Sequence, residues 1–592
     1  MKLKNICNDL NLDMSDKYYI IFLACFSILI TLMIVKFHQS RGAFNSDIYV
    51  YLASALDFAG MNYNHISSVG ALSNSPFICY LTSLLFKLGF VHVNSIYFVT
   101  SIFSISGIFA MYILLKARFS NMLSLVGALV YSSFSLTLFY FANGMLDVPA
   151  VALMLWTLIF TVAAADKNPK YYILVGLFFA MSFFTRFTTG FIVILVALYI
   201  LKDYDLINLA ECLFQSRDEF KQRLVSFFKS SEFKWMCISI IIVAAIVAYV
   251  FYVISSFNAP VNYLNTAANS VDRFHRPRDP NYILDKFFYV KNYLSLLFAN
   301  EITSPMQIEK FSNPSVMSYL MMAILFFGFL IKSINVIKNK DFYRDNIRKI
   351  PFRSPKSENV LKIAVVVLFI LSVISFKFNY IYTVILMWMA LVILQSLIKK
   401  YDSVNINNFS LSLVCFGLFS FYMAIFSFMH LKCVRYILPT LPAFAYFVIY
   451  ALDSILNYIK YGWEDKSSDK PKVKSDFRLR ASQILPIIMI VLLLFTAFNF
   501  TNTVEIDDLS LNFHNAANFL LDHDQDYQSK DIGVNTGDRY YEWYFKKDVD
   551  RINPNRFNSS DYDYVFVYDD LDNPDYHEIY RHGIVGVYER NF

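Results

Sequence analysis

The chain has 592 residues, of which 57% are hydrophobic and only 17% are charged. Soluble proteins carry roughly 25% charged residues, so this composition excludes a soluble globular protein. The formal net charge of +6 does not indicate nucleic-acid binding, because Lys and Arg gather in a few loops between long apolar runs. The pattern is typical of an integral membrane protein with many spans.

Apolar runs predict about thirteen membrane-spanning helices. The run 171–201 contains Arg186, which a single helix would bury near mid-membrane at a cost of roughly 2.5–3.5 kcal/mol. We therefore interpret this run as two short spans with Arg186 at the outer turn. The other spans are expected at 18–37, 95–115, 122–141, 148–165, 235–257, 316–337, 363–377, 380–397, 409–429, 436–455 and 484–500.

Basic loops fix the expected orientation of these spans. The loops 202–234, 338–362 and 460–480 are rich in Lys and Arg, and thirteen spans place all three on one side. The positive-inside rule makes this side cytoplasmic, with the N-terminus inside and the C-terminus outside. In the first outer loop, 47–60 and 76–90 are expected to form helices at the membrane interface.

The chain is expected to divide into a membrane domain, 1–500, and an external domain, 501–592. The second part is polar but patterned. It predicts an amphipathic helix at Phe513–Leu521 and short strands at Asp531–Val534, Tyr564–Tyr568 and Gly586–Glu589. A small α/β domain on the outer face follows from this pattern.

Acidic residues at helix starts on the outer face are the first candidates for chemistry. Asp47 follows the first span, and Asp147 precedes Pro149 at the start of another. Both patterns are also typical of helix caps, so capping is the alternative interpretation for each. Asp57 lies about 80° from Asp47 around the same helix, which permits both to face one pocket.

Cations on the outer face are the second signal. Lys432 and Arg435 are spaced i, i+3 and would share a helix face if the segment is helical. Outward cations run against the positive-inside bias and favour an anion such as a lipid phosphate, to which Arg makes bidentate contacts. Snorkelling to lipid headgroups is the alternative. Arg186 adds a third cation.

Neither a metal nor a disulfide framework is evident in the seven scattered cysteines, which have no CxxC spacing. His275 lies in the basic loop segment 271–282, together with Arg273. A solvated loop is the default for such charge. A contact of His275 with substrate or a divalent metal is the sharper alternative, and no cofactor is certain.

Four patterns in order give the chain its resemblance to a known family. It resembles the GT-C superfamily of polyprenyl-phosphate-dependent glycosyltransferases, in the branch of protein O-mannosyltransferases and lipid A aminoarabinose transferases. The patterns are Ser46-Asp47-Ile48-Tyr49 followed by Tyr51-Leu52-Ala53, Ser75-Pro76-Phe77 to Phe86-Lys87, Leu146-Asp147-Val148-Pro149 followed by Gly176 to Thr185-Arg186, and Arg435-Tyr436-Ile437-Leu438-Pro439.

The resemblance implies a reaction and roles. A sugar would pass from a polyprenyl-phosphate donor in the bilayer to a protein, lipid or glycan acceptor outside the cytoplasm, with inversion. Asp47 would be the catalytic base and Asp147 the second acidic position. The implied phosphate-binding residues are Arg435, Lys432 and Arg186, and the possible substrate or metal contacts are His275, Arg273, Asp57 and Tyr436.

Two other functions stay open. The chain could be a transporter or flippase of a lipid-linked sugar, or a non-catalytic scaffold on the same fold. Transporters commonly carry inverted repeats and broken helices at mid-membrane. The sequence has no convincing repeat, and its ionisable residues gather at one face, which favours the enzyme.

Overall fold

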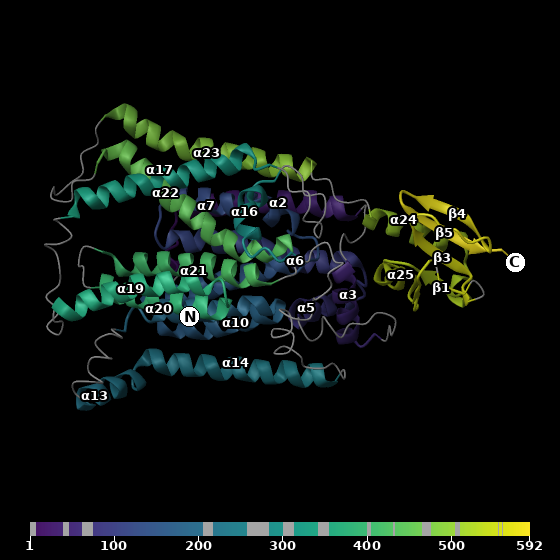
Figure 1. Ribbon diagram of the computed structural model, residues 1–592, viewed down its shortest axis with the longest axis horizontal. Helices are drawn as coiled ribbons and strands as arrows, with labels where there is room; N and C mark the ends of the chain where they lie inside the picture. The colour runs from purple at the N-terminus through teal and green to yellow at the C-terminus, as the bar shows by residue number, and fades with distance from the viewer. Residues whose placement is uncertain are drawn as a thin grey trace.

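The computed structural model describes residues 7–39, 46–61, 75–204, 217–256, 283–299, 313–340, 355–399, 404–429, 432–463, 475–503, 509–554, 556–558 and 561–591. These residues form an elongated bundle of helices with a small sheet-containing domain at one end (Figure 1).

Ten helices are long and apolar enough to cross a membrane, so the chain is a multi-pass membrane protein. They are α2 (Asp16–Gln39), α6 (Val93–Lys116), α9 (Asp147–Asp166), α14 (Ser231–Ser256), α17 (Val316–Lys338), α19 (Pro355–Ser375), α20 (Tyr380–Ile398), α21 (Ile406–Phe428), α22 (Leu441–Tyr461) with the preceding 3-10 turn η4 (Val434–Thr440), and α23 (Asp476–Thr503).

The expected count of thirteen spans is not confirmed, because the other three apolar runs form shorter helices. These are α7 (Asn121–Ser133), α10 (Tyr172–Thr185) and α11 (Ile192–Ile200). The single span expected at 122–141 is wrong. Phe134 has an extended backbone and separates α7 from α8 (Ser135–Phe139).

Hydrogen bonds to neighbouring segments accompany this break. The Ser133 hydroxyl donates to the carbonyl of Leu493 at 3.3 Å, and the Ser135 hydroxyl donates to the carbonyl of Ala299 at 3.0 Å. Serine side chains readily bond to backbone groups outside their own helix. Apolar periodicity cannot reveal partners so distant in the sequence.

The hairpin expected at 171–201 is confirmed. Helix α10 ends at Thr185, Arg186 is extended, and η2 (Phe187–Phe191) leads into α11. Arg186 reaches the first residue of α9, and Lys202, just past α11, reaches the last residue of α9, Asp166. Both ends of α9 are therefore tied to the same hairpin.

Several segments expected as loops contain helices. The basic segment 202–234 contains α13 (Arg217–Phe228), and the stretch between the spans expected at 235–257 and 316–337 contains α16 (Phe288–Leu297). Helix α19 begins inside the segment 338–362. Helix α16 forms in a polar segment because one of its faces packs on the bundle, where the side chains of Tyr289 and Tyr293 are buried.

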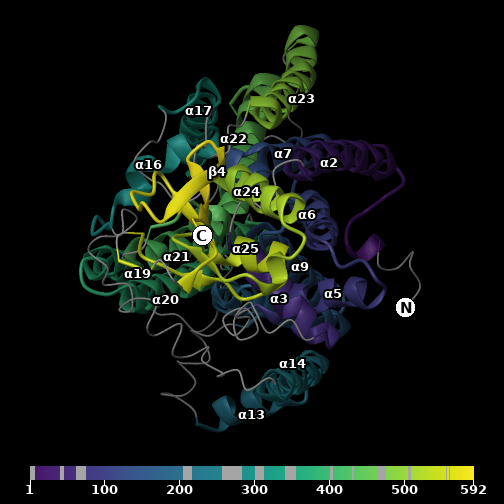
Figure 2. The same ribbon diagram turned by 90° about the vertical axis from the view of Figure 1, so that its right-hand side faces the viewer.

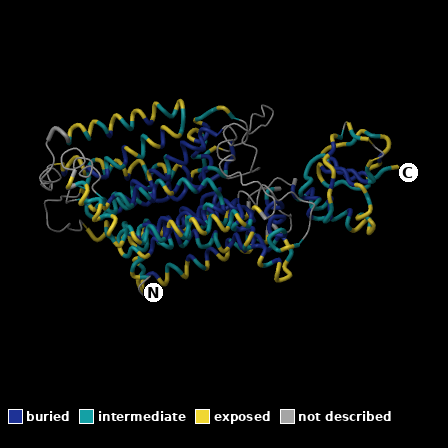
Figure 3. The backbone as a smooth tube through the Cα atoms, turned by 90° about the horizontal axis from the view of Figure 1, so that it is seen from below, coloured by how far each residue is buried: buried dark blue, intermediate teal, exposed yellow. Residues whose placement is uncertain are grey.

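Burial is concentrated in the middle of the bundle (Figure 3). Helices α6, α9, α21 and α22 bury most of their apolar windows, whereas α14, α17 and α19 bury less than a fifth of theirs. Exposed apolar helix surface of this extent is expected where lipid replaces water. The buried inner helices include α9, which carries Asp147.

The two helices expected in the first outer loop are confirmed as α3 (Ser46–Ala59) and α5 (Pro76–Lys87). They pack on each other at the end of the bundle that faces the C-terminal domain (Figure 1). This position brings the start of α3 close to three other parts of the chain.

The C-terminal domain is a small α/β unit, as predicted. Its five-stranded sheet has the order β2-β1-β3-β5-β4, in which β1 pairs parallel with β2 and β3 and the other pairs are antiparallel. The elements are α24 (Leu509–His523), β1 (Ile532–Val534), α25 (Asp538–Phe545), β2 (Asp550–Arg551), β3 (Tyr564–Tyr568), β4 (Tyr576–His582) and β5 (Val585–Arg590). Helix α25 packs against α3 (Figure 2).

Candidate active site

Asp47 and Arg435, which are 388 positions apart, form an ion pair. Both terminal nitrogens of Arg435 lie near Asp47 Oδ2, at 3.2 and 3.3 Å. Asp47 stands in the first turn of α3, and Arg435 is carried by η4. The Asp47 carboxylate therefore faces the interior of the charged site, with 29% of its side chain exposed.

A second ion pair joins Asp147 and Arg186. Arg186 Nε lies 2.9 Å from Asp147 Oδ1, and both side chains are largely buried. Asp147 is the first residue of α9, but the N-cap position belongs to Leu146 and no side-chain capping bond forms there. The capping interpretation of Asp147 is therefore wrong, since its carboxylate binds an arginine.

A third arginine comes from the C-terminal domain. Arg539, on α25, lies with Nη1 3.7 Å from Asp47 Oδ1, whereas Arg435 donates to Oδ2. Burial by itself would raise the pKa of the Asp47 carboxyl, but Arg435, Arg186 and Arg539 outweigh it and lower that pKa below its ordinary value. Asp47 is therefore ionised at neutral pH.

Buried tyrosines lie around these charges. Tyr51, one turn along α3 from Asp47, interacts electrostatically with both carboxylates and with Arg186 and Arg435. Burial, reinforced by Asp47, raises the pKa of the Tyr51 phenol, so the hydroxyl stays neutral. From the sequence, Tyr51 is named only as part of a family pattern without a role in the site, and Arg539 was missed. The spacing i, i+4 from Asp47 was the available signal for Tyr51, and no sequence signal pointed to Arg539.

A small cavity of ≈ 10 Å³ lies against the Asp147–Arg186 pair and Arg435. Its lining includes Asp147, Arg186, Arg435 and Tyr436. Arg435 Nε and Asp147 Oδ2 are buried without a hydrogen-bond partner among the described residues. A cavity of this volume holds about one water molecule. A larger polar group therefore enters only if the arginine side chains move, and it would meet an N–H donor and a carboxylate oxygen.

An apolar cavity of ≈ 250 Å³ reaches the end of α10 that precedes Arg186. Its walls come from α3, α5, α10 and α14, and Phe184 on α10 is two residues from Arg186. The described lining has no charged side chain: Phe58, Pro76, Phe77, Tyr80, Leu177, Ala180, Met181, Phe184, Ile246, Tyr249, Val250, Val253 and Ile254.

Of the other predicted site residues, only Tyr436 joins this group. Lys432 precedes η4, so it shares no helix face with Arg435, contrary to the helical interpretation. Its buried ammonium donates to the carbonyls of Ser427, at 2.7 Å, and Phe426 at the end of α21. Burial lowers the pKa of Lys432 to about 8, against the attraction of Asp285.

The remaining predictions concern residues away from the site or outside the described residues. Asp57 follows Asp47 by ten residues, which is about 15 Å of helix at 1.5 Å per residue, and it is not part of the cavity lining. His275 and Arg273 lie outside the described residues. Among the described residues, no three His, Cys, Asp or Glu side chains are grouped to hold a metal ion.

The fold and the site together define a multi-pass helical membrane protein with a buried cluster of carboxylates and arginines at one end. Residues 73–210 match the family described as dolichyl-phosphate-mannose-protein mannosyltransferase. This segment contains Asp147 and Arg186. The resemblance to polyprenyl-phosphate-dependent glycosyltransferases is confirmed for this part of the chain. No curated protein matches the sequence.

Solved structures with a similar helical arrangement include two proteins described with lipid phosphates. One is ArnT from Cupriavidus metallidurans bound to undecaprenyl phosphate, with 10% identity, a TM-score of 0.47 and coverage of 96% of this chain and 97% of that chain. The other is the oligosaccharyltransferase AglB from Archaeoglobus fulgidus, in complex with an inhibitory peptide and a dolichol-phosphate. It has 11% identity, a TM-score of 0.46 and coverage of 94% and 70%.

Proposed function

We propose that the chain is a GT-C-type glycosyltransferase that moves a sugar from a polyprenyl-phosphate donor to an acceptor hydroxyl outside the cytoplasm. The observation that carries the proposal is the pairing of Asp47 with Arg435 and of Asp147 with Arg186, where Arg435, Asp147 and Arg186 line one small cavity. The family match over residues 73–210 supports the reaction class. The transfer chemistry belongs to residues 1–500, and residues 501–592 form the external domain.

In this reaction Asp47 is the general base. The acceptor oxygen attacks the anomeric carbon as its proton passes to the Asp47 carboxylate. The bond from the anomeric carbon to the phosphate oxygen breaks, and its electron pair leaves with the polyprenyl phosphate. Attack opposite the leaving group inverts the anomeric centre. Asp147 holds Arg186 in place beside the leaving phosphate.

The arginines link donor binding to the strength of the base. Arg435 and Arg186 are the cations best placed for the donor phosphate, and guanidinium groups bind phosphate in bidentate geometry. A phosphate that draws Arg435 away from Asp47 removes the partner that contributes most to lowering the pKa of Asp47. The carboxylate then becomes a stronger base when the donor is bound.

The adjacent apolar cavity suits the isoprenoid part of the donor. It borders α10 next to Arg186 and is lined by aromatic and aliphatic side chains. A lipid whose phosphate lies at Arg186 would therefore find an apolar surface within reach. Burial of such a chain contributes roughly 0.8 kcal/mol for each methylene group removed from water.

The test uses the full chain in lipid nanodiscs with a panel of polyprenyl-phosphate hexoses and pentoses. We first measure binding of undecaprenyl phosphate and of dolichyl phosphate. We expect Arg435→Gln and Arg186→Gln each to weaken binding at least tenfold, since each removes a charge-assisted contact worth about 1.5–3 kcal/mol. Arg551→Gln, at an exposed position on β2, is the matched control.

Transfer is measured next, with Asp47→Asn as the decisive variant. We expect loss of at least a hundredfold in transfer with unchanged binding of the lipid phosphate. Lys432→Met tests the sequence-based prediction that Lys432 binds the phosphate. In the structure, the Lys432 ammonium donates a hydrogen bond to a carbonyl at the end of α21. Unchanged transfer in Asp47→Asn with a donor that the parent chain uses would refute the role of Asp47.

A further inference from the structure

We propose that Arg539, from the C-terminal domain, is a positioning residue of the Asp47 site, so that this domain completes the site within the same chain. The proposal deepens the proposed function and rests on it for the reaction. The contact itself is independent of that reaction, because it joins two described side chains across the interface of α3 and α25.

The two oxygens of Asp47 have different arginine partners. Arg435 lies against Oδ2, whereas Arg539 Nη1 lies 3.7 Å from Oδ1. The first arginine comes from the membrane domain and the second from the C-terminal domain. Because each oxygen has a cation beside it, rotation of the carboxylate about the Cβ–Cγ bond is restricted.

An aromatic cluster fixes α25 on α3 and so fixes the place of Arg539. The ring of the buried Tyr49 lies 4.7 Å from the ring of Tyr540 and 6.1 Å from those of Trp543 and Tyr544. The hydroxyls of Tyr49 and Tyr544 are 3.3 Å apart, and that of Tyr544 is also 2.7 Å from His514 Nδ1 on α24. Aromatic contacts of this kind add about 0.5–1.5 kcal/mol per pair.

Arg539 differs from the other cations in its exposure. Its side chain is 43% exposed, while Arg435 and Arg186 are mostly buried. If the donor phosphate takes up Arg435 and Arg186, Arg539 is the cation that stays with Asp47. It then holds the carboxylate in the direction of the acceptor and keeps it ionised while the donor is bound.

The charges that face this contact come from several elements. Asp47 faces Arg435 on η4, Arg186 at the end of α10 and Arg539 on α25, and Asp147 on α9 pairs with Arg186. On the side of the C-terminal domain, Arg539 interacts with Glu542. When Arg539 is removed, Arg435 and Arg186 remain as the cations that lower the pKa of Asp47.

Carbodiimide labelling tests the contact without any transfer assay, because the reagent reacts with protonated carboxyl groups. The full chain in nanodiscs is labelled between pH 3 and 8, and modification of Asp47 is measured by peptide mass spectrometry. We expect Arg539→Gln to raise the midpoint pH by about half a unit, which is about a threefold change in the protonated fraction. Arg539→Lys should restore the midpoint, and Arg551→Gln should leave it unchanged.

An unchanged midpoint in Arg539→Gln would overturn the proposal, and so would a shift that Arg539→Lys fails to reverse. A general loosening of the interface raises labelling at every pH without moving the midpoint, so it also counts against the proposal. The pH at which the transfer rate falls to half on acidification is then compared with the labelling midpoint. If labelling shifts while the transfer profile does not, the contact stands and the proposed role of Asp47 as base fails.

Discussion

Asp47 and Asp147 are both paired with arginines, but they differ in burial. The Asp147 side chain is 7% exposed and its partner Arg186 is also largely buried, whereas Asp47 keeps a larger exposed fraction. Removal of one partner of a buried pair leaves an uncompensated charge, which costs about 3–5 kcal/mol. Removal of the Asp47 charge costs much less, because Asp47 is partly exposed and the Arg435 left behind still interacts electrostatically with Asp147.

Asp147→Asn is therefore expected to lower both transfer and stability, by about 3 kcal/mol of unfolding free energy. Asp47→Asn is expected to remove transfer with a loss below about 1 kcal/mol. Thermal unfolding of the two variants in the same detergent measures this contrast. Equal melting temperatures for both variants would contradict the buried pairing of Asp147 with Arg186.

Glu542 on α25 carries a titration near neutral pH. Burial, together with Asp538 and Asp548, raises the pKa of its carboxyl to about 7, and Arg539 opposes the rise. The folded state then holds the proton more tightly than the unfolded state, whose Glu has a pKa near 4.5. This contribution to stability is present in full below pH 4.5 and is lost as the pH rises through about 7.

We expect the unfolding free energy of the C-terminal domain to be lower at pH 8 than at pH 5, by up to about 1 kcal/mol after allowance for solvent screening. The domain should therefore unfold at a lower temperature at pH 8. Glu542→Gln should remove this part of the pH dependence. Unfolding is followed by tryptophan fluorescence, since Trp543 is on the same helix. Glu578→Gln is a contrasting control, because Arg581 lowers the pKa of the Glu578 carboxyl.

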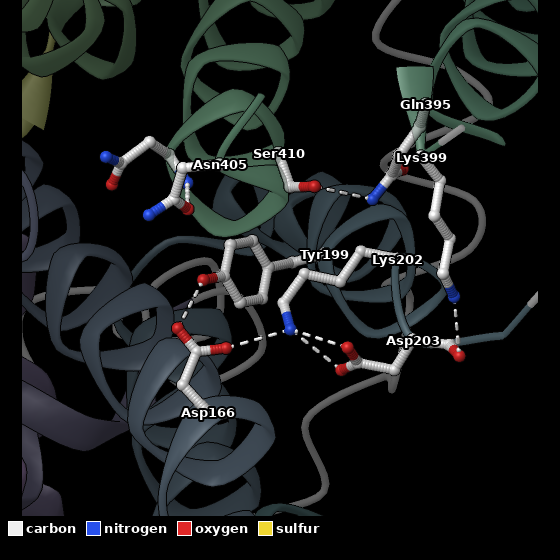
Figure 4. Close-up of polar contacts among 9 residues, drawn as sticks. Asp166, Tyr199, Lys202, Asp203, Gln395, Lys399, Asn405 and Ser410 are labelled. Atoms are coloured by element: carbon white, nitrogen blue, oxygen red, sulfur yellow. Dashed lines mark hydrogen bonds and ion pairs between the residues drawn. The ribbon is translucent and has the colours of Figure 1, made fainter. Parts of the chain in front are cut away.

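Helix α9 connects two charged clusters at its opposite ends. Asp147 is its first residue and Asp166 its last, about 28 Å apart at 1.5 Å per residue. At the second end Lys202 Nζ lies 2.8 Å from both Asp166 and Asp203, and the Tyr199 hydroxyl donates to Asp166 at 2.9 Å (Figure 4). The Lys202 side chain is almost fully buried. This cluster joins the end of α9 to the end of α11.

Lys202→Met is expected to destabilise the chain by about 3 kcal/mol, because among the described residues Asp166 then keeps only the Tyr199 phenol as its partner. Lys399→Met is the matched control: its Nζ donates to the exposed backbone carbonyl of Asp203 at 3.0 Å. We expect a loss below about 1 kcal/mol there. Thermal unfolding measures both, and the folded fraction of Lys202→Met should retain transfer because the cluster lies far from Asp147.

At the scale of the whole molecule, the proposed orientation places the C-terminal domain and Asp47 outside the cytoplasm. It places the Lys202 cluster near the cytoplasmic face of the membrane. We expect Arg551→Cys to react with a membrane-impermeant maleimide in intact cells. A cysteine in place of Lys229, which follows α13, should react only after permeabilisation. The parent chain, with its seven native cysteines, is the background control. Labelling of the second variant in intact cells would contradict the orientation.

Local patterns determined much of this protein before any tertiary contact was known. Apolar length predicted most of the helices, the charged turn at Arg186 predicted a hairpin, and a short run of aromatic and β-branched residues predicted β3 at Tyr564–Tyr568. Asp47, Asp147, Arg186 and Arg435 were named from spacing and side of the membrane. These signals succeed because burial in lipid and backbone hydrogen bonding act on neighbouring residues.

Tertiary structure alone decided which of these charges meet. Lys432 and Arg435 are three residues apart, yet the ammonium bonds to the end of α21 while the guanidinium reaches Asp47. Arg539 joins the same carboxylate from 492 positions further along the chain. Ion pairing depends on distances of a few ångströms in space, and the packing of α25 on α3 sets those distances, which no local period in the sequence encodes.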